Sequence, residues 1–300
     1  MKILITGSNG LLGQKLVKLL AAKEQVQLLA TSKGSNRINS EKGYKYQSLD
    51  ITDREQVNTV FDQFKPEVVI NTAAMTNVDA CETDKELCWG LNVNAVKYLI
   101  AASEKYQAHL IHLSTDFVFD GEAGPYDETA TPNPLSYYGL SKYEAERLVQ
   151  NSNTKWAIVR TIIVYGVGEN MSRSNIVLWA KEALEKGNPL NIVNDQFRSP
   201  TLSEDLAMGC WLIAQKGAEG VYHISGKDIM SIIGLVYKVA DFYGYDKSII
   251  SPVSSANLNQ AAKRPPRTGF ILDKAKRELG YSPHSFEEGL AIITQQLKSL

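Results

Sequence analysis

The chain has 300 residues, of which 44% are hydrophobic, enough to bury a large core in one domain or in a main domain with a smaller lobe. Its 32 basic and 33 acidic residues give a net charge of -1 without a long block of one sign, which excludes a charged tail for nucleic acid or membrane. We therefore expect neither nucleic acid nor a membrane as a partner.

The first apolar run, Lys2–Thr6, turns to glycine at Gly7. It is too short for a signal peptide or for a helix that spans a membrane, so we expect a cytoplasmic protein, with a homodimer left open. The three cysteines Cys81, Cys88 and Cys210 show no CxxC spacing, and the four histidines form no ligand pair on one helix face. We expect buried free thiols and no metal.

Short β-branched apolar runs alternate with amphipathic stretches through the first half of the chain. This alternation predicts parallel strands joined by helices, because right-handed crossovers leave a helix over the sheet after each strand. We expect a doubly wound α/β domain of the Rossmann type. The expected strands are Lys2–Thr6, Gln25–Ala30, Val68–Asn71, His109–Ser114 and Trp156–Arg160, and the helices among them include Leu11–Leu20 and Tyr138–Val149.

A glycine-rich turn, Thr6–Gly13, follows the first strand and opens the first helix. In this context Gly7 permits the tight turn, Gly10 lets backbone amides approach a pyrophosphate, and Gly13 lets the helix pack closely on the sheet. The pattern predicts a dinucleotide site. The turn residues expected to contact the cofactor are Gly7, Asn9, Gly10, Leu11, Leu12 and Gly13.

The second strand ends where an NAD-selective site places an acidic residue for the ribose 2′-hydroxyl. Here the chain has Ser32, Lys33 and Arg37 instead, which offer a hydroxyl and two cations to a 2′-phosphate. We therefore expect NADP(H) to be preferred over NAD(H), although loop cations are often simply solvated. Asp50 is expected on the adenine amino group and Ile51 against its ring, while Thr52 or Asp53 caps the next helix.

Tyr138 and Lys142 lie four residues apart on a predicted helix, which puts the phenol and the ammonium on one face. A neighbouring cation favours the phenolate and is expected to bring the pKa of the phenol closer to working pH. The strand ending in Thr115 places a hydroxyl at the carboxyl edge of the sheet, where doubly wound folds bind ligands. These three residues predict an acid–base centre.

The regular alternation fades beyond about residue 165. Two amphipathic segments, Asn175–Lys186 and Ile233–Tyr243, flank a short run at Gly220–Ser225 with the pattern of one more strand. We expect residues 1–165 to form the dinucleotide-binding domain. Residues 166–300 should form mainly a substrate lobe, with a segment at about 190–225 returning to the main sheet.

Six motifs together resemble the dTDP-4-dehydrorhamnose reductase family of extended short-chain dehydrogenases, over nearly the whole chain. They are TGSNGLLG (Thr6–Gly13), NTAAMTNVDACE (Asn71–Glu82), LSTDFVFDG (Leu113–Gly121), PYDETATPNPLSYYGLSK (Pro125–Lys142), VRTIIVYG (Val159–Gly166) and NDQFRSPTLSEDLA (Asn194–Ala207). The resemblance implies a catalytic triad of Thr115, Tyr138 and Lys142, joined by Asn92. It also implies cofactor contacts from Ala73, Ala74 and Ser114, and substrate contacts from Thr76, Val78, Asp116 and Phe117.

The implied reaction is NADPH-dependent reduction at C4 of a nucleotide-linked 4-keto-6-deoxy sugar, as in rhamnose biosynthesis, with Tyr138 as proton donor. Arg198 and Arg264 are candidates for the substrate diphosphate, because a guanidinium suits phosphate oxygens. Each of them is equally a candidate for a surface or interdomain ion pair.

Two features of the chain depart from the family pattern. Ile163 stands where these reductases usually carry a tryptophan, and Asn170–Ile176 replaces a short asparagine-phenylalanine segment. Both lie in the substrate lobe, so they bear on which sugar is used rather than on the reaction type.

Two other functions are compatible with the same scaffold. The regulatory subunit of methionine adenosyltransferase resembles this family and acts through a protein partner, although a purely binding role does not require Thr115, Tyr138 and Lys142. A sugar-nucleotide epimerase or dehydratase ranks below reduction. Dehydratases need a glutamate after the aspartate, and Phe117 follows Asp116 here.

Overall fold

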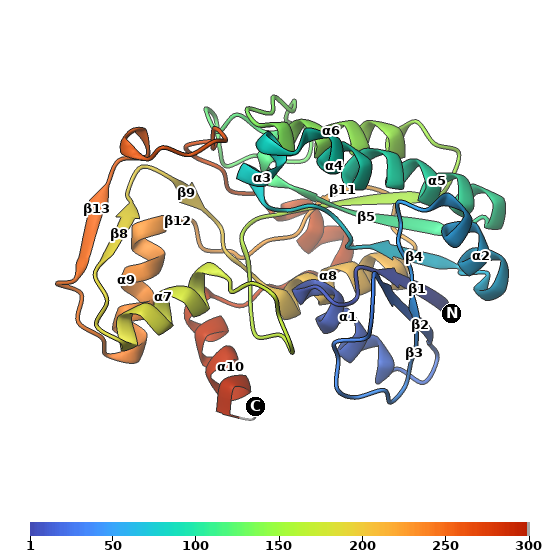
Figure 1. Cartoon of the computed structure of the whole chain (residues 1–300), viewed down its shortest axis with the longest axis horizontal. Coiled ribbons are helices and arrows are strands. Elements are labelled where there is room, and N and C mark those ends of the chain that lie inside the picture. Colours follow the sequence, from blue (N-terminus) through green and yellow to red (C-terminus); the bar gives the residue numbers. More distant parts are fainter. Residues whose placement is uncertain (299–300) are drawn as a thin grey trace.

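The computed structural model describes residues 1–298, and its centre is a seven-stranded parallel sheet with the order β11-β6-β5-β4-β1-β2-β3 (Figure 1). This order reverses direction beside β1, which is the switch point of a doubly wound fold. The expected fold class is confirmed. The strands are β1 (Lys2–Thr6), β2 (Gln27–Ser32), β3 (Lys45–Ser48), β4 (Val68–Asn71), β5 (His109–Thr115), β6 (Trp156–Thr161) and β11 (Gly220–His223).

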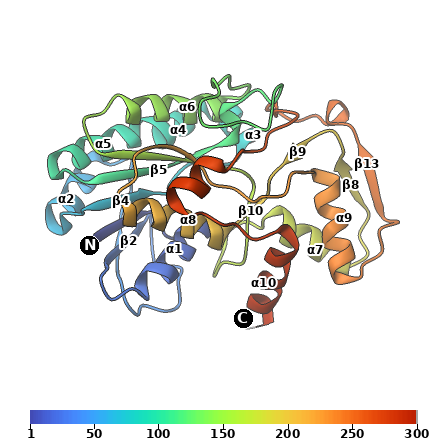
Figure 2. The ribbon, with the colours of Figure 1, turned by 180° about the vertical axis from the view of Figure 1, so that it is seen from behind.

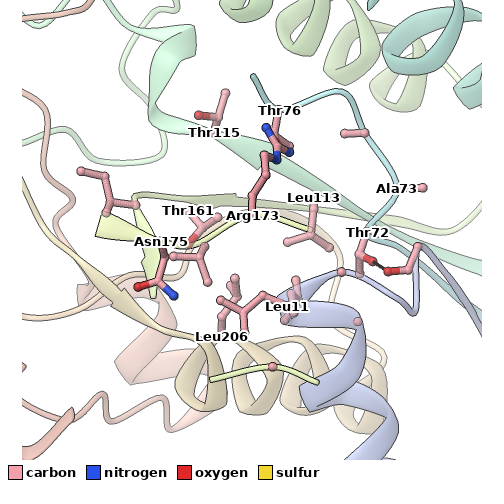
Figure 3. A pocket seen from close by; sticks show the side chains of 18 of the residues that line it. Leu11, Thr72, Ala73, Thr76, Leu113, Thr115, Thr161, Arg173, Asn175 and Leu206 are labelled. Carbon is pink, nitrogen blue, oxygen red and sulfur yellow. Dashed lines mark hydrogen bonds between the residues drawn. The ribbon is translucent and has the colours of Figure 1, made fainter. Parts of the chain in front are cut away.

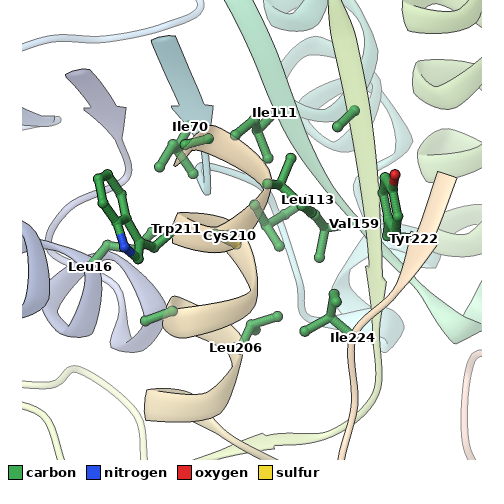
Figure 4. Close-up of a cluster of buried hydrophobic side chains, with 14 of the residues drawn as sticks. Leu16, Ile70, Ile111, Leu113, Val159, Leu206, Cys210, Trp211, Tyr222 and Ile224 are labelled. Atoms are coloured by element: carbon green, nitrogen blue, oxygen red, sulfur yellow. The ribbon is translucent and has the colours of Figure 1, made fainter. Parts of the chain in front are cut away.

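Helices cover both faces of the sheet because alternate strand residues are apolar on both sides. Ile3 and Ile5 face the layer of α1 (Leu11–Ala21) and α8 (Ser203–Lys216), whose buried side chains are shown in Figure 4. Leu4 faces the opposite layer of α2 (Arg54–Phe64), α5 (Ala95–Tyr106) and α6 (Tyr137–Gln150). Each fully buried Leu or Ile contributes about 1.5–3 kcal/mol, so both layers hold the sheet in place.

The element ends follow hydrogen bonding more closely than hydrophobicity. β1 and β4 have the expected bounds, whereas β2 begins at Gln27 because its pairing with β1 starts opposite Lys2. The side chain of Asp53 accepts from two backbone amides and caps α2, as expected. The side chain of Ser136 caps α6 in the same way, accepting from the backbone N–H of Gly139.

A second lobe, on the left of Figure 1, has its own buried cluster that includes Val177, Val236 and Leu290. Its elements are α7 (Ile176–Glu185), β8 (Leu190–Val193), α9 (Ile232–Tyr243), β13 (Ile250–Val253) and α10 (Phe286–Lys298). β8 pairs with β13 in this lobe. The chain returns to the main sheet through α8 and β11, which lie within the predicted stretch of about 190–225, while the division into two domains stays a prediction.

Short elements connect the two lobes. Two-residue strands pair β7 (Val164–Tyr165) with β10 (Thr201–Leu202) and β9 (Phe197–Arg198) with β12 (Met230–Ser231). The view from behind shows the short helical stretch at Ala275–Leu279 packed against α8 (Figure 2). The remaining elements are α3 (Val78–Thr83), α4 (Lys85–Trp89), a π-helical stretch at Gly90–Asn94 and single turns at Asp116–Val118 and Ser255–Asn257. No helix within residues 1–298 is long and apolar enough to cross a membrane.

Candidate active site

A cleft of about 1180 Å³ lies at the carboxyl ends of the central strands, between the main sheet and the second lobe (Figure 3). Doubly wound folds bind ligands at this edge. The predicted residues for cofactor, chemistry and substrate all line this cleft, with the exception of Asn92. The structure thus brings together residues from both halves of the chain.

The glycine turn forms one wall of the cleft. Gly7 has a φ of +73°, and a side-chain carbon there would lie 2.7 Å from the backbone nitrogen of Ala73, so only glycine fits. A side chain at Gly13 would clash with the carbonyl oxygen of Gly7. Gly13 was expected to pack on the sheet, but its close neighbours are the backbone atoms of the glycine turn. No side chain caps α1, so its first N–H groups stay available to an anion.

The loop after β2 is braced by the glycine turn. The side chain of Asn9 accepts from the backbone N–H of Arg37 at 2.9 Å and donates to the carbonyl of Ser35 at 2.8 Å. Lys33 pairs with Asp50 across the rim of the cleft at 2.7 Å, and this hydrogen bond raises the pKa of Lys33. Lys33, Arg37 and Asp50 therefore form a rim with two cations and one carboxylate at the dinucleotide end.

The site also contains buried polar groups that a bound dinucleotide can satisfy. The hydroxyls of Ser8 and Ser114 are buried and have no hydrogen-bond partner among the described residues. Buried polar groups are normally paired, so unpartnered hydroxyls beside a cleft fit a ligand with polar groups that binds there. Together with the uncapped α1 and the two cations of the rim, these groups fit a phosphorylated dinucleotide.

The three catalytic candidates are buried at the floor of the cleft, with exposed fractions of 6% for Thr115, 7% for Tyr138 and 2% for Lys142. The ring of Tyr138 packs edge-on against Phe117 with centroids 5.7 Å apart. The ammonium of Lys142 donates to the carbonyl of Leu113 at 2.6 Å, which ties α6 to the end of β5. Thr115 caps the following turn by accepting from the backbone N–H of Phe117 at 3.2 Å.

Burial dominates the acidity of this centre. It raises the pKa of Tyr138 above the ordinary value for a tyrosine, and it lowers the pKa of Lys142 to about 8. The expectation that the ammonium of Lys142 would bring the phenol toward working pH is wrong for this arrangement. Burial of the phenol is the main cause of its raised pKa, and the nearby carboxylate of Asp116 acts in the same direction, whereas the hydrogen bond with Thr115 lowers the pKa.

Asn92 lies behind the catalytic helix instead of lining the cleft. Its amide nitrogen donates to the carbonyl of Met75 at 3.1 Å and to the hydroxyl of Ser141 at 2.9 Å, while its oxygen accepts from the N–H of Met75 at 2.8 Å. It sits in the π-helical stretch Gly90–Asn94, a local irregularity often found at functional sites. Its observed contacts tie the loop after β4 to α6.

A polar chain that the sequence analysis did not detect runs behind Lys142. Thr6 donates to Asn71 at 2.6 Å, the amide nitrogen of Asn71 lies 3.0 Å from Nδ1 of His112, and Nε2 of His112 lies 3.3 Å from the Lys142 nitrogen. Thr6, Asn71 and His112 are register partners on three adjacent strands. Aligning the polar ends of the predicted strands would have found them.

This row of hydrogen bonds selects one tautomer of His112. The oxygen of Asn71 accepts from Thr6 and from the backbone N–H of Ala73, so its nitrogen must donate to Nδ1 of His112. Burial lowers the pKa of His112 well below its ordinary value, which keeps the ring neutral and places its proton on Nε2. Nε2 then presents a donor to Lys142, which favours the neutral amine of that lysine.

On the substrate side, Asp116 and Arg198 form a buried pair 3.5 Å apart. Asp116 also accepts from Thr268 at 2.6 Å, and burial raises the pKa of its carboxyl group. The guanidinium of Arg198 donates to the carbonyls of Phe197 at 2.7 Å and Pro265 at 2.6 Å. Arg198 therefore links the two lobes from inside.

Arg264 forms a two-pronged ion pair with Asp79, with N–O distances of 3.2 and 2.7 Å. Asp79 belongs to α3, next to Val78, which faces the cleft. For both Arg198 and Arg264 the structure thus shows the ion-pair alternative. Their contact with a substrate stays a prediction.

The segment 166–176, between β7 and α7, lines much of the cleft, and the sequence analysis assigned it no contacts. Its members at the cleft are Gly166, Gly168, Met171, Ser172, Arg173, Ser174, Asn175 and Ile176. Asn175 fixes its end by capping α7 and donating to the carbonyl of Gly166 at 2.7 Å. Nearby Ile163 also lines the cleft, and its φ of +32° is unusual for a β-branched residue.

Comparison with protein families matches residues 1–299 to the model of the RmlD substrate binding domain. A dTDP-4-dehydrorhamnose reductase from Aggregatibacter actinomycetemcomitans is 32% identical, over 97% of this chain and 98% of its own length. Methionine adenosyltransferase 2 subunit beta of Xenopus tropicalis is 30% identical, over 88% of this chain and 78% of its own.

Two solved structures are similar along their whole length. A dTDP-4-dehydrorhamnose reductase from Clostridium acetobutylicum superimposes with a TM-score of 0.88 at 32% identity, covering 99% of this chain and 100% of that one. A dTDP-4-dehydrorhamnose reductase from Bacillus anthracis, solved in complex with NADP, gives a TM-score of 0.83 at 29% identity, covering 98% and 99%.

Proposed function

Because the chain belongs to the family of the RmlD substrate binding domain, as the resemblance of its motifs predicts, we propose that it reduces a nucleotide-linked 4-keto-6-deoxy sugar with NADPH. The observation that carries this proposal is the single cleft that holds both the glycine turn and the trio Thr115, Tyr138 and Lys142. A cofactor at the turn and a keto group at the trio would lie next to each other. The cytoplasmic location and the homodimer stay predictions of the sequence.

When bound, NADPH supplies the hydride that adds to the keto carbon. Tyr138 donates its proton to the carbonyl oxygen as negative charge develops there, and the hydroxyl of Thr115 donates a hydrogen bond to the same oxygen. The raised pKa of Tyr138 keeps the phenol protonated before the reaction. Lys142 holds the nicotinamide ribose and, with a pKa of about 8, can return a proton to Tyr138 afterwards.

The preference for NADPH rests on the loop after β2. Ser32, Lys33 and Arg37 all line the cleft there, and a 2′-phosphate would find a hydroxyl and two cations. The only carboxylate at this rim, among the described residues that line the cleft, is Asp50, which already pairs with Lys33. A rim of this composition should attract a 2′-phosphate, whereas the unpaired acidic side chain of an NAD-selective site would repel it.

A regulatory role is the second candidate, because a 30% identical relative is named as a subunit of methionine adenosyltransferase. A binding role does not require an acid, a hydroxyl and a lysine buried together at the end of a cofactor cleft. The position after Asp116 holds Phe117, whose ring packs on Tyr138, so no carboxylate stands there for a dehydratase. Reduction therefore remains the primary proposal.

The test is consumption of NADPH by the purified protein with a panel of nucleotide-linked keto-sugars that includes dTDP-4-keto-6-deoxyhexoses. We expect turnover with at least one member of the panel and the reduced sugar as product. Tight NADPH binding without turnover on any keto-sugar would favour the regulatory role instead. Water release from a nucleotide-linked hexose without net NADPH consumption would identify a dehydratase.

A further inference from the structure

Three arginines line the substrate end of the cleft, and they differ in whether their guanidinium group already pairs with a carboxylate. Arg198 is held by Asp116 and by backbone carbonyls, and Arg264 by both carboxylate oxygens of Asp79. Moving Arg198 would leave the buried carboxylate of Asp116 without its partner, which costs several kcal/mol, whereas Arg264 would give up a bidentate pair with the more accessible Asp79. Both arginines therefore already have a carboxylate partner, and Arg198 in particular cannot turn toward a ligand at low cost.

Arg173 is different. It is exposed, and it donates one hydrogen bond of 3.2 Å to the hydroxyl of Thr76 on the opposite wall of the cleft (Figure 3). Among residues 1–298, no carboxylate oxygen lies within 4.0 Å of its guanidinium. A single bond to a neutral hydroxyl is weak in water, so a phosphate can replace it readily.

The charges around the cleft favour a polyanion. The basic residues lining it are Lys33, Arg37, Lys142, Arg173, Arg198 and Arg264, and the acidic ones are Asp50 and Asp116. Both acids are already paired, Asp50 with Lys33 and Asp116 with Arg198. Ile176, the first residue of α7, also lines the cleft, so the positive end of that helix lies beside Arg173.

Arg173 lies on the substrate side of the cleft rather than on the cofactor side. Its partner Thr76 lies in the loop after β4, whereas Lys33 and Arg37 follow β2, on the other side of β1 in the sheet. The pyrophosphate of a dinucleotide belongs at the start of α1. Arg173 thus serves the half of the cleft that also holds Thr115 and Phe117.

We propose that Arg173 binds the diphosphate of the nucleotide-linked substrate, exchanging its hydrogen bond to Thr76 for charge-assisted bonds to phosphate oxygens. This inference rests on the proposed function, since it takes the ligand to be a nucleotide sugar. It makes the part of the segment 166–176 around Arg173 a substrate-binding element, whereas Glu169 and Asn170 contact the loop after β2. Arg173 acts in binding and has no part in proton transfer.

The test compares Arg173→Gln, which keeps hydrogen-bond donors but removes the charge, with Arg277→Gln, an exposed arginine whose side chain is 67% accessible and which lies outside the cleft lining. Isothermal titration of the NADP-loaded protein uses dTDP, UDP and thymidine as probes. We expect Arg173→Gln to weaken binding of the preferred nucleoside diphosphate about 10- to 100-fold. Thymidine and NADPH should bind as before, and Arg277→Gln should resemble the unaltered protein.

Several outcomes would overturn the inference. They are unchanged diphosphate binding in Arg173→Gln, an equal loss for thymidine, a loss of NADPH affinity, or the absence of nucleoside diphosphate binding by the unaltered protein. Arg173→Lys should recover part of the affinity, because it restores the charge without the guanidinium fork. These measurements need no turnover. Diphosphate binding that depends on Arg173, in a protein that reduces no keto-sugar, would therefore overturn the proposed reaction alone.

Discussion

Replacing Tyr138 by phenylalanine isolates the proton donor from the packing of its ring. Tyr138 is 7% exposed, its ring packs against Phe117, and it belongs to a buried cluster with Cys81 and Cys88. Phenylalanine retains these contacts, so the fold should survive with a change of no more than about 1 kcal/mol from the lost hydroxyl. The substitution removes only the phenolic hydroxyl, whose proton we propose Tyr138 donates to the carbonyl oxygen.

The expected loss lies in turnover. General acid catalysis contributes roughly 10²- to 10⁴-fold in rate, which corresponds to about 3–5 kcal/mol of transition-state stabilisation. Because burial raises the pKa of Tyr138, the phenol of the unaltered protein is fully protonated at neutral pH. The whole factor should therefore appear at pH 7, with the affinity for NADPH little changed.

Single-turnover NADPH oxidation and calorimetric NADPH binding, measured side by side, separate the two effects. Tyr137→Phe is the matched control, since Tyr137 lies on the same helix but packs against Trp89 outside the cleft lining. It should react like the unaltered protein. If Tyr138→Phe reduces the keto-sugar at the rate of the control, Tyr138 is not the proton donor and the assignment of α6 as the catalytic helix is wrong.

Three further outcomes follow from the same contacts. Changing Lys33 and Arg37 together to alanine should narrow the preference for NADPH over NADH, because each charge-assisted contact is worth about 1.5–3 kcal/mol. An equal narrowing of this preference by the distant variant Lys181→Ala would contradict this prediction. Glu146→Gln should lower the free energy of unfolding by about 3–5 kcal/mol in urea, because Glu146 forms a buried pair with Arg160 at 2.6 Å, whereas Glu144→Gln at an exposed pair should cost under about 1 kcal/mol. The pKa of Lys142 is lowered to about 8, so at this residue the unfolded chain binds more protons than the folded chain between pH 8 and 10.5, and Lys142 should add stability as the pH rises across that window. The Lys142→Met variant should therefore gain less stability, or lose more, than the unaltered protein over the same pH range.

The sequence predicts best where a feature is local. The glycine turn and the pair Tyr138 and Lys142 each lie within one short segment, so spacing alone places them on one loop or one helix face. The buried strands β1 and β4 could also be predicted from sequence, because each has an uninterrupted apolar run, Ile3–Ile5 in β1 and Val68–Ile70 in β4. β2 was misplaced by two residues because pairing with β1, rather than the apolar run, sets where it begins.

Contacts between distant segments could not be predicted in this way. The sequence shows the guanidinium of Arg198 but not that Asp116 and the carbonyl of Pro265 surround it. The effect of Lys142 on Tyr138 was misjudged for a similar reason. Spacing on a helix says that two groups are near, whereas the depth of burial decides which of them changes its pKa and in which direction.

The substrate end of the cleft depends most on such long-range contacts. Ile163 is held at a φ of +32°, a conformation that costs a β-branched residue about 1–3 kcal/mol and persists only where neighbours enforce it. The carbonyls of Ile162 and Ile163 accept from the hydroxyl and the N–H of Thr201, at 2.6 and 3.0 Å, which fixes this turn. A small aliphatic side chain therefore faces the cleft from a strained turn, close to the segment that carries Arg173. Ile163 and Arg173 lie in the stretch from the end of β6 to α7, whereas Thr115 ends β5 and Tyr138 and Lys142 lie on α6, so substitutions in that stretch can alter the substrate end of the cleft while leaving the acid–base trio in place.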